Sequence, residues 1–218
     1  MLRSGWSSLL LLVTLAAYSQ PADSLRGFRK PTGLRVGTDL IALGKTIARV
    51  PLTGWELNAD IDLGRFYPVV ELGSWKRKQP LVNGMYTNSG RYARIGMDIN
   101  FLLKDPDKNM FFIGFRYGRA SYSEQVSYTL TPDLFPVVQQ TLSNAGARAG
   151  WAELTTGLRV KVWRGFWMGY TARMKFLPHT SGTSAFDSYD IPGYGLPFKG
   201  LYWGFNYQVF WRVPFERH

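Results

Sequence analysis

Eight segments of the chain alternate apolar and polar residues along a period of two. The clearest covers residues 55–63, where Trp55 and Leu57 fall on one face and Glu56 and Asp60 on the other. Successive side chains of a β-strand point to opposite faces, so each segment predicts a strand with one apolar and one charged face. The expected strands are residues 33–40, 55–63, 67–75, 91–102, 110–120, 151–162, 166–176 and 201–213.

The connections between these strands are alternately short and long. The short ones are residues 64–66, 104–109 and 163–165, and the long ones are 41–54, 76–90, 121–150 and 177–200. Strands of about 9–11 residues joined by short periplasmic turns and long outer loops are typical of transmembrane barrels. The sequence therefore predicts an all-β fold over residues 33–215. It is an eight-stranded antiparallel up-and-down transmembrane β-barrel with both termini in the periplasm.

The longest connection, residues 121–150, is expected to contain some regular structure. Val126, Tyr128 and Leu130 continue the alternation of the preceding strand and predict that it extends beyond the membrane. Pro132 follows Thr131 as a helix-starting signal, which predicts a short helix over residues 134–142.

The first residues are typical of a secretory signal peptide over residues 1–19. Arg3 supplies a positive charge, residues 9–17 are a short apolar run, and Ala17 and Ser19 are the small residues expected before a cleavage site. Residues 20–32 are polar and are expected to be a periplasmic lead-in. The chain has no cysteine, which excludes disulfides, thiol chemistry and a lipid-anchoring cysteine.

Alternation alone does not decide which face of the barrel is inside, because a secreted lipocalin-like barrel would turn its apolar face inward. Eleven aromatic residues lie on the apolar face, too many for the interior of eight strands: Trp55, Phe101, Phe111, Tyr117, Phe166, Tyr170, Phe176, Trp203, Phe205, Tyr207 and Trp211. We therefore expect the apolar face to contact lipid, and glycines on the polar face to leave room for long charged chains.

The polar face carries nearly balanced charge, as expected where each buried charge needs a partner. Its acids and bases predict an ion-pair network that fills the lumen and prevents substantial conductance: Arg35, Asp39, Glu56, Asp60, Asp62, Glu71, Arg94, Asp98, Arg116, Glu153, Arg159, Arg173 and Arg212, with Lys161 and Lys175 on the same face. A cluster of Asp60, Asp62 and Asp98 could also bind a divalent cation, but ion pairing is the favoured interpretation, and no metal or cofactor is expected.

The formal net charge of +11 must then lie mainly in loops, turns and tails. Export argues against a nucleic-acid partner. Cations at the expected outer rim could contact the phosphates of lipopolysaccharide, and they are Lys76, Arg77, Lys78, Arg91 and Arg119. The alternative is that these charges are simply solvated.

One set of loop residues could carry chemistry. His179 lies near several serines and aspartates: Ser181, Ser184, Asp187, Ser188 and Asp190. A Ser/His/Asp arrangement facing the outer leaflet would suit an acyltransferase or phospholipase. Serine and aspartate are common in loops, so a non-enzymatic protein is favoured, with this lipid-modifying enzyme as the alternative.

Several motifs resemble those of a Bacteroidota family of small outer-membrane barrels whose function is unassigned. They are residues 33–40 (GLRVGTDL), 114–118 (GFRYG), 157–163 (GLRVKVW), 191–195 (IPGYG) and 204–207 (GFNY). The resemblance implies an outer-membrane location and a single barrel, and it supplies no catalytic residues. Residues 23–25 (DSL) resemble an O-glycosylation site of that phylum. The leading hypothesis is a structural protein or an accessory subunit of a larger envelope complex.

Overall fold

The computed structural model describes residues 30–48, 50–130 and 137–215. The expected signal peptide, most of the lead-in and the DSL motif lie outside these residues. In the described part, no helix is long and apolar enough to cross a membrane.

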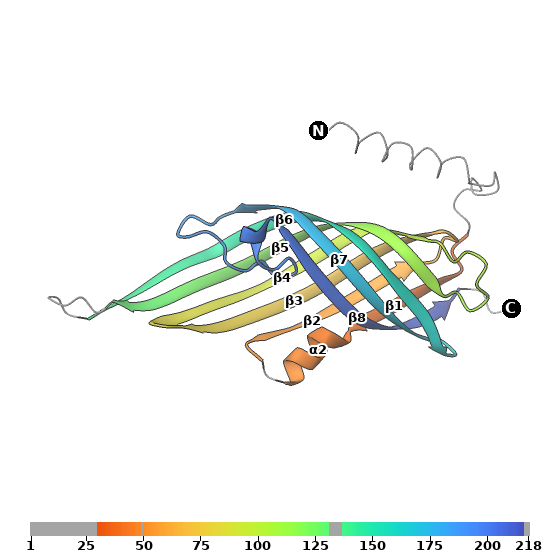
Figure 1. Cartoon of the computed structure of the whole chain (residues 1–218), viewed down its shortest axis with the longest axis horizontal. Helices are drawn as coiled ribbons and strands as arrows, with labels where there is room; N and C mark the ends of the chain where they lie inside the picture. The colour runs from red at the N-terminus through yellow and green to blue at the C-terminus, as the bar shows by residue number, and fades with distance from the viewer. Residues whose placement is uncertain (1–29, 49, 131–136, 216–218) are drawn as a thin grey trace, which may run out of the picture.

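Eight antiparallel strands close into a ring, in which each strand pairs with the next and β8 pairs with β1 (Figure 1). The fold is all-β, as predicted, and each predicted strand is present. The strands are β1 (Gly33–Asp39), β2 (Leu52–Ile61), β3 (Phe66–Leu81), β4 (Gly84–Asn100), β5 (Met110–Leu130), β6 (Val138–Trp163), β7 (Phe166–Ser181) and β8 (Leu201–Pro214).

Charged side chains fill the inside of the ring and apolar side chains cover its outside. Along β5, buried and exposed residues alternate from Met110 to Gln125 without interruption. Arg116 is fully buried, whereas Phe115 and Tyr117 beside it are about half exposed. This alternation follows from strand geometry, since neighbouring side chains point to opposite faces.

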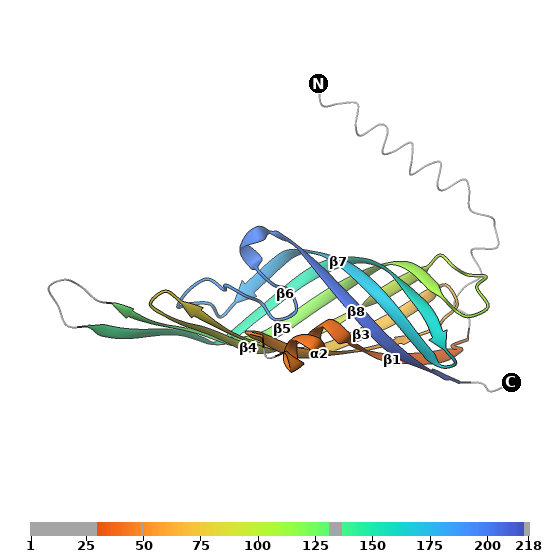
Figure 2. The same ribbon diagram turned by 60° about the horizontal axis from the view of Figure 1, so that its bottom comes forward.

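Strands β3, β4 and β6 are longer than the sequence predicts, so two hairpins extend beyond the ring. β3 and β4 pair as far as Leu81 and Gly84, and β5 and β6 pair as far as Leu130 and Val138. Both hairpins project beyond the ring at the end opposite the described termini (Figure 2). The predicted extension of the fifth strand over residues 126–130 is confirmed.

The predicted helix over residues 134–142 is wrong for the part that the structure describes. Residues 138–142 belong to β6 and pair with residues 126–130 of β5. A continuous ladder satisfies the backbone groups of this segment, and it outweighs the local helix-starting signal of Pro132. Residues 134–136 lie outside the described part.

The first long connection contains a helix that the sequence analysis does not predict. β1 ends at Asp39, and α2 (Leu40–Ile47) follows at once. The Asp39 carboxylate accepts a hydrogen bond from the Ile41 backbone N–H at 3.0 Å, as an N-cap does, and Lys45 lies in the last turn. The chain changes from strand to helix at Asp39, whose side chain caps the helix while it stays buried.

Glycines on the inner face make room for large side chains. A Cβ at Gly73 would collide with the ring of Tyr92, and a Cβ at Gly118 with the ring of Trp151. At Gly114, it would collide with the carboxylate of Asp98. The room expected for charged chains is therefore also used by aromatic rings.

Candidate functional site

Glu71 on β3 is the centre of the buried charge network. Its carboxylate lies 2.9 Å from Arg94 Nη1 of β4 and 2.9 Å from Arg173 Nη1 of β7. Arg116 Nε of β5 lies 3.5 Å away. Residues far apart in the sequence thus meet in the ring, and three guanidinium groups surround one carboxylate.

Two further glutamates complete this inner cluster. Glu153 of β6 lies 2.9 Å from Arg94 Nε and 3.1 Å from Arg173 Nη1. Glu56 of β2 lies 2.8 Å from Arg94 Nη1, and it also accepts a hydrogen bond from Tyr92 OH at 2.7 Å. Each arginine therefore contacts several carboxylates, which offsets the cost of removing these charges from water.

A second cluster lies nearer the short turns. Arg159 Nη1 is 2.6 Å from Asp60, and its Nη2 is 3.2 Å from Asp98. Arg35 Nε pairs with Asp60 at 2.7 Å, and Arg116 Nη2 pairs with Asp98 at 2.6 Å. Because Arg116 also contacts Glu71, the two clusters form one continuous network across the ring.

The structure brings together most of the residues that the sequence analysis assigns to the network. Asp62 is placed at the end of the ring that carries the short turns, with Arg212 3.4 Å away and Lys108 3.8 Å away. Asp39 differs from the expectation, because it has no cationic partner within 4.0 Å among the described residues. It accepts hydrogen bonds from Asn206 Nδ2 at 2.8 Å and from the backbone of Ile41 and Tyr207.

The assignment of Lys161 to the inner face also differs. Lys161 is not inside the ring: it is partly exposed at a short turn, where its Nζ lies 2.7 Å from Asp107. Among the described residues, no group of three or more histidine or acidic side chains is arranged to hold a metal ion. Arginines occupy the space between Asp60 and Asp98, consistent with the ion-pairing interpretation.

The segment between β7 and β8 packs onto inward side chains at the end of the ring opposite the short turns, which the sequence analysis did not predict. Gly193 O accepts hydrogen bonds from Arg94 Nη2 at 2.9 Å and from Lys175 Nζ at 2.7 Å. Tyr194 packs against Trp151, with ring centroids 5.9 Å apart. Gly193 and Gly195 have φ values of 82° and 113°, so only glycine makes this tight turn without strain.

Asp190 fixes the same segment to β3. Its Oδ2 accepts a hydrogen bond from Trp75 Nε1 at 3.0 Å and lies 3.2 Å from Arg77 Nε. Arg77 is therefore turned towards a carboxylate, and not free for a lipid phosphate as the sequence analysis suggested. Burial raises the pKa of Asp190 to about 6, opposed by Arg77 and the Trp75 hydrogen bond and reinforced by Glu124.

We expect the docking of this segment to weaken as the pH rises from about 4 to above 6. The pKa of Asp190 is higher in the docked segment than in water, so the docked state binds the proton more tightly. Docking is then most favourable when Asp190 is protonated, and this advantage is lost as the pH passes the raised pKa. Hydrogen exchange of the Tyr194 and Gly195 amides, measured at each pH in the native protein and in Asp190→Asn, checks this expectation. Protection of these amides should fall with rising pH in the native protein and not in the variant. The same pH dependence in both proteins would contradict the role of Asp190.

Four cations remain on the outer face, at the upper edge of the apolar surface. Lys76, Arg91, Arg119 and Arg148 come from β3, β4, β5 and β6, and they line one shallow groove. No carboxylate of the described residues lies within 4.0 Å of any of them. Arg148 was missed because it falls where the sequence predicted an irregular loop. Lys78 is also exposed, farther along the projecting part of β3.

The structure does not assemble a catalytic arrangement around His179. His179 is exposed near the end of β7, opposite Gly150. The Ser188 hydroxyl instead contacts Tyr122 OH at 2.5 Å and donates to Glu124 at 2.8 Å. Among the described residues, no hydrogen bond joins His179 to Ser181, Ser184, Asp187, Ser188 or Asp190.

Comparison with known proteins gives one match. A family model with the description "Domain of unknown function (DUF6048)" matches residues 1–218. No curated protein and no solved structure matches the chain. The function must therefore be argued from the chemistry of the ring.

Proposed function

We propose that this chain, which belongs to the family described as a domain of unknown function (DUF6048), is an integral outer-membrane β-barrel. Its apolar outer face contacts lipid and its charged interior is closed to ions. We propose a non-enzymatic role, as a structural protein or an accessory subunit of a larger envelope complex.

The observation that carries this proposal is the inversion of the usual burial pattern. Large apolar side chains are exposed around the whole ring, among them Ile95 (62%), Trp203 (54%) and Phe205 (53%), while arginines and carboxylates are buried inside. A water-soluble protein rarely exposes an apolar patch larger than a few hundred Å². Lipid is the solvent in which this distribution is favourable.

The same pattern argues against the secreted lipocalin-like alternative. Such a barrel binds its ligand in an apolar interior, but the middle of this ring holds Glu71, Arg94, Arg116 and Arg173 in mutual contact. The lipid-modifying alternative is not favoured either, because it depended on His179, which is exposed and, among the described residues, makes no hydrogen bond to the loop serines or aspartates.

The four outward cations support an outer-leaflet partner with phosphate groups. Lys76, Arg91, Arg119 and Arg148 lie where the apolar surface ends and polar side chains such as Ser89 and Ser121 begin. Guanidinium groups bind phosphates through charge-assisted hydrogen bonds. We therefore propose that lipopolysaccharide phosphates contact this part of the surface.

Membrane fractionation tests the proposal. The protein should stay with the outer-membrane fraction after washing with high salt and alkaline carbonate, and only detergent should release it. A peripheral membrane protein from the same cells is the control, because complete washing should remove it. Recovery of the folded protein in the soluble fraction would overturn the proposal.

Two further measurements test the other parts of the proposal. A steady single-channel current in planar bilayers would contradict an interior closed to ions. Elution of the protein alone from mild detergent would contradict the subunit version.

A further inference from the structure

The wall of the ring is incomplete on one side near its outer end. β1 pairs with β8 only up to the pair Asp39–Gln208, so within the described part of the chain residues 201–207 of β8 have β7 as their only strand partner. β1 pairs with β2 no farther than Leu57, so residues 52–56 of β2 pair only with β3. Between these two edges the ring has a side opening.

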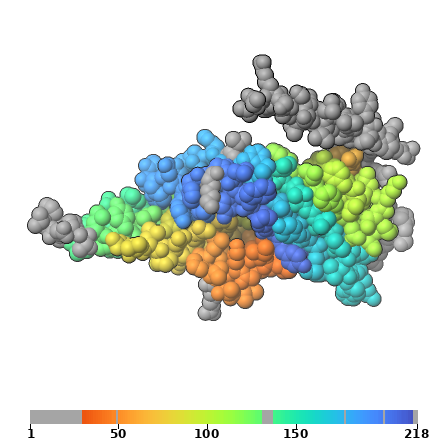
Figure 3. Space-filling view, in the orientation of Figure 1, coloured from red at the N-terminus to blue at the C-terminus, as the bar shows by residue number. Residues whose placement is uncertain are grey.

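α2 lies across this opening without sealing it. Thr46 Oγ1 donates to Gly54 O at 2.7 Å and accepts from Gly54 N–H at 2.9 Å, which fixes the helix to the edge of β2. Figure 3 shows α2 (orange) on the surface between β8 (dark blue) and β3 (yellow). A cavity of about 350 Å³ remains, lined by α2, β2, β8 and the inward Lys175.

Lys175 gives this cavity a buried amine that no described carboxylate contacts. Its side chain is only 5% exposed, and its Nζ donates to Gly193 O at 2.7 Å and to Tyr194 O at 3.1 Å. No carboxylate of the described residues lies within 4.0 Å of Nζ, whereas Arg94 and Arg77 in the same cavity are both paired. The Asp39 carboxylate also lines the cavity, without a cationic partner among the described residues, so a protonated Lys175 together with Lys45 at the entrance leaves one positive charge in excess. A buried charge without a counter-ion is costly, and the excess favours an anion.

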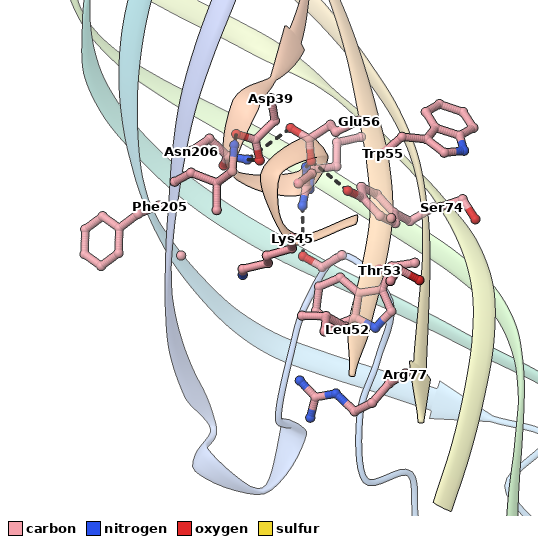
Figure 4. A pocket seen from close by; sticks show the side chains of 18 of the residues that line it. Asp39, Lys45, Leu52, Thr53, Trp55, Glu56, Ser74, Arg77, Phe205 and Asn206 are labelled. Atoms are coloured by element: carbon pink, nitrogen blue, oxygen red, sulfur yellow. Dashed lines mark hydrogen bonds and ion pairs between the residues drawn. The ribbon is translucent and has the colours of Figure 1, made fainter. Parts of the chain in front are cut away.

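A second cation lies at the entrance. Lys45 of α2 is exposed, lines the cavity and has no carboxylate within 4.0 Å among the described residues. Figure 4 shows Lys45 between Trp55 and Phe205, whose rings point away from the cavity on opposite sides. With Trp203, these rings form an apolar surface that begins at the edge of the opening.

We infer that the side opening binds an anionic amphiphile. A carboxylate or phosphate head group is held by Lys175 and Lys45, and an acyl chain lies outside along Trp55, Trp203 and Phe205. The volume of the cavity is within the range of small-molecule sites. The inference rests on the proposed membrane location, because the membrane supplies the amphiphile.

Quenching of tryptophan fluorescence by 9,10-dibromostearate tests this site, using the purified full chain in a non-ionic detergent. We expect saturable quenching, at least tenfold weaker binding in Lys175→Met, and unchanged binding in the matched control Lys104→Met, which alters an exposed turn. Lys45→Met is expected to weaken binding severalfold without touching the interior, so it still tests the site if Lys175→Met fails to fold. Unaltered affinity in Lys45→Met and Lys175→Met would overturn the inference.

Competitors identify the ligand class. Oleate and a lysophosphatidic acid should displace the probe, whereas oleyl alcohol and inorganic phosphate alone should not. Displacement by phosphate alone would overturn the amphiphile in favour of a free anion. A stable dimer that abolishes probe binding would overturn it in favour of a second copy of the chain. A protein that inserts into bilayers without binding the probe overturns only this inference, whereas a protein that is soluble without detergent overturns the membrane proposal itself.

Discussion

Glu71→Gln is expected to lower the free energy of unfolding by about 3–5 kcal/mol, the usual cost of removing one partner from a buried ion pair. The Glu71 carboxylate contacts Arg94, Arg116 and Arg173, all of them buried. Glutamine keeps the size of the side chain but leaves the guanidinium groups with too little negative charge. Urea unfolding in phospholipid vesicles, followed by tryptophan fluorescence, measures the change.

Asp107→Asn is the matched control for this prediction. Asp107 also pairs with a cation, Lys161 at 2.7 Å, but the two side chains are 55% and 33% exposed. Water screens such a pair, so the loss should be below about 1 kcal/mol. The double variant Glu71→Gln, Arg173→Gln should recover part of the loss of the single variant, because it removes the excess positive charge. Equal effects of Glu71→Gln and Asp107→Asn would contradict a buried network.

Ile95→Arg is expected to destabilise the protein in a bilayer by about 2–4 kcal/mol, the cost of an arginine on the lipid face near the midplane. Ile95 is 62% exposed and points outward from β4. In water, arginine at so exposed a position would change stability by no more than about 0.5 kcal/mol. The same urea titration in vesicles separates these two expectations.

Ser123→Arg is the control for the position of the charge. Ser123 is an exposed residue of β5, farther along the strand than the rim cation Arg119. An arginine near the interface costs only about 0–1 kcal/mol. A small effect at both positions would contradict lipid contact at Ile95.

The ring and its inward charges could be predicted because they depend on a local property. In each strand, such as residues 110–120, the alternation of apolar and polar residues distinguishes the two faces, whichever strands it pairs with. In the projecting part of the β5–β6 hairpin the signal is incomplete: Val126, Tyr128 and Leu130 continue the alternation of β5, but the sequence analysis does not identify residues 138–150 of β6 as a strand. The pairing of this part depends on a partner strand twenty residues away, which periodicity does not identify.

The individual contacts of the site could not be predicted for a similar reason. Glu71 meets Arg173 only because β3 and β7 face each other across the ring, and that distance depends on how all eight strands are staggered. The docking of Asp190 on Trp75 likewise joins residues 115 positions apart. The helix α2 was within reach of the sequence, since Asp39 as N-cap and Lys45 in the last turn are ordinary helix signals.

Quenching by brominated phospholipids tests the central claim most directly, which is that the apolar face contacts acyl chains. Two variants each retain one tryptophan, Trp203 on the outer face or Trp151 inside the ring, where it is 1% exposed. In vesicles of lipids brominated along the acyl chain, we expect strong quenching of Trp203 and little quenching of Trp151. Equal quenching of both, or quenching of Trp151 alone, would contradict the account.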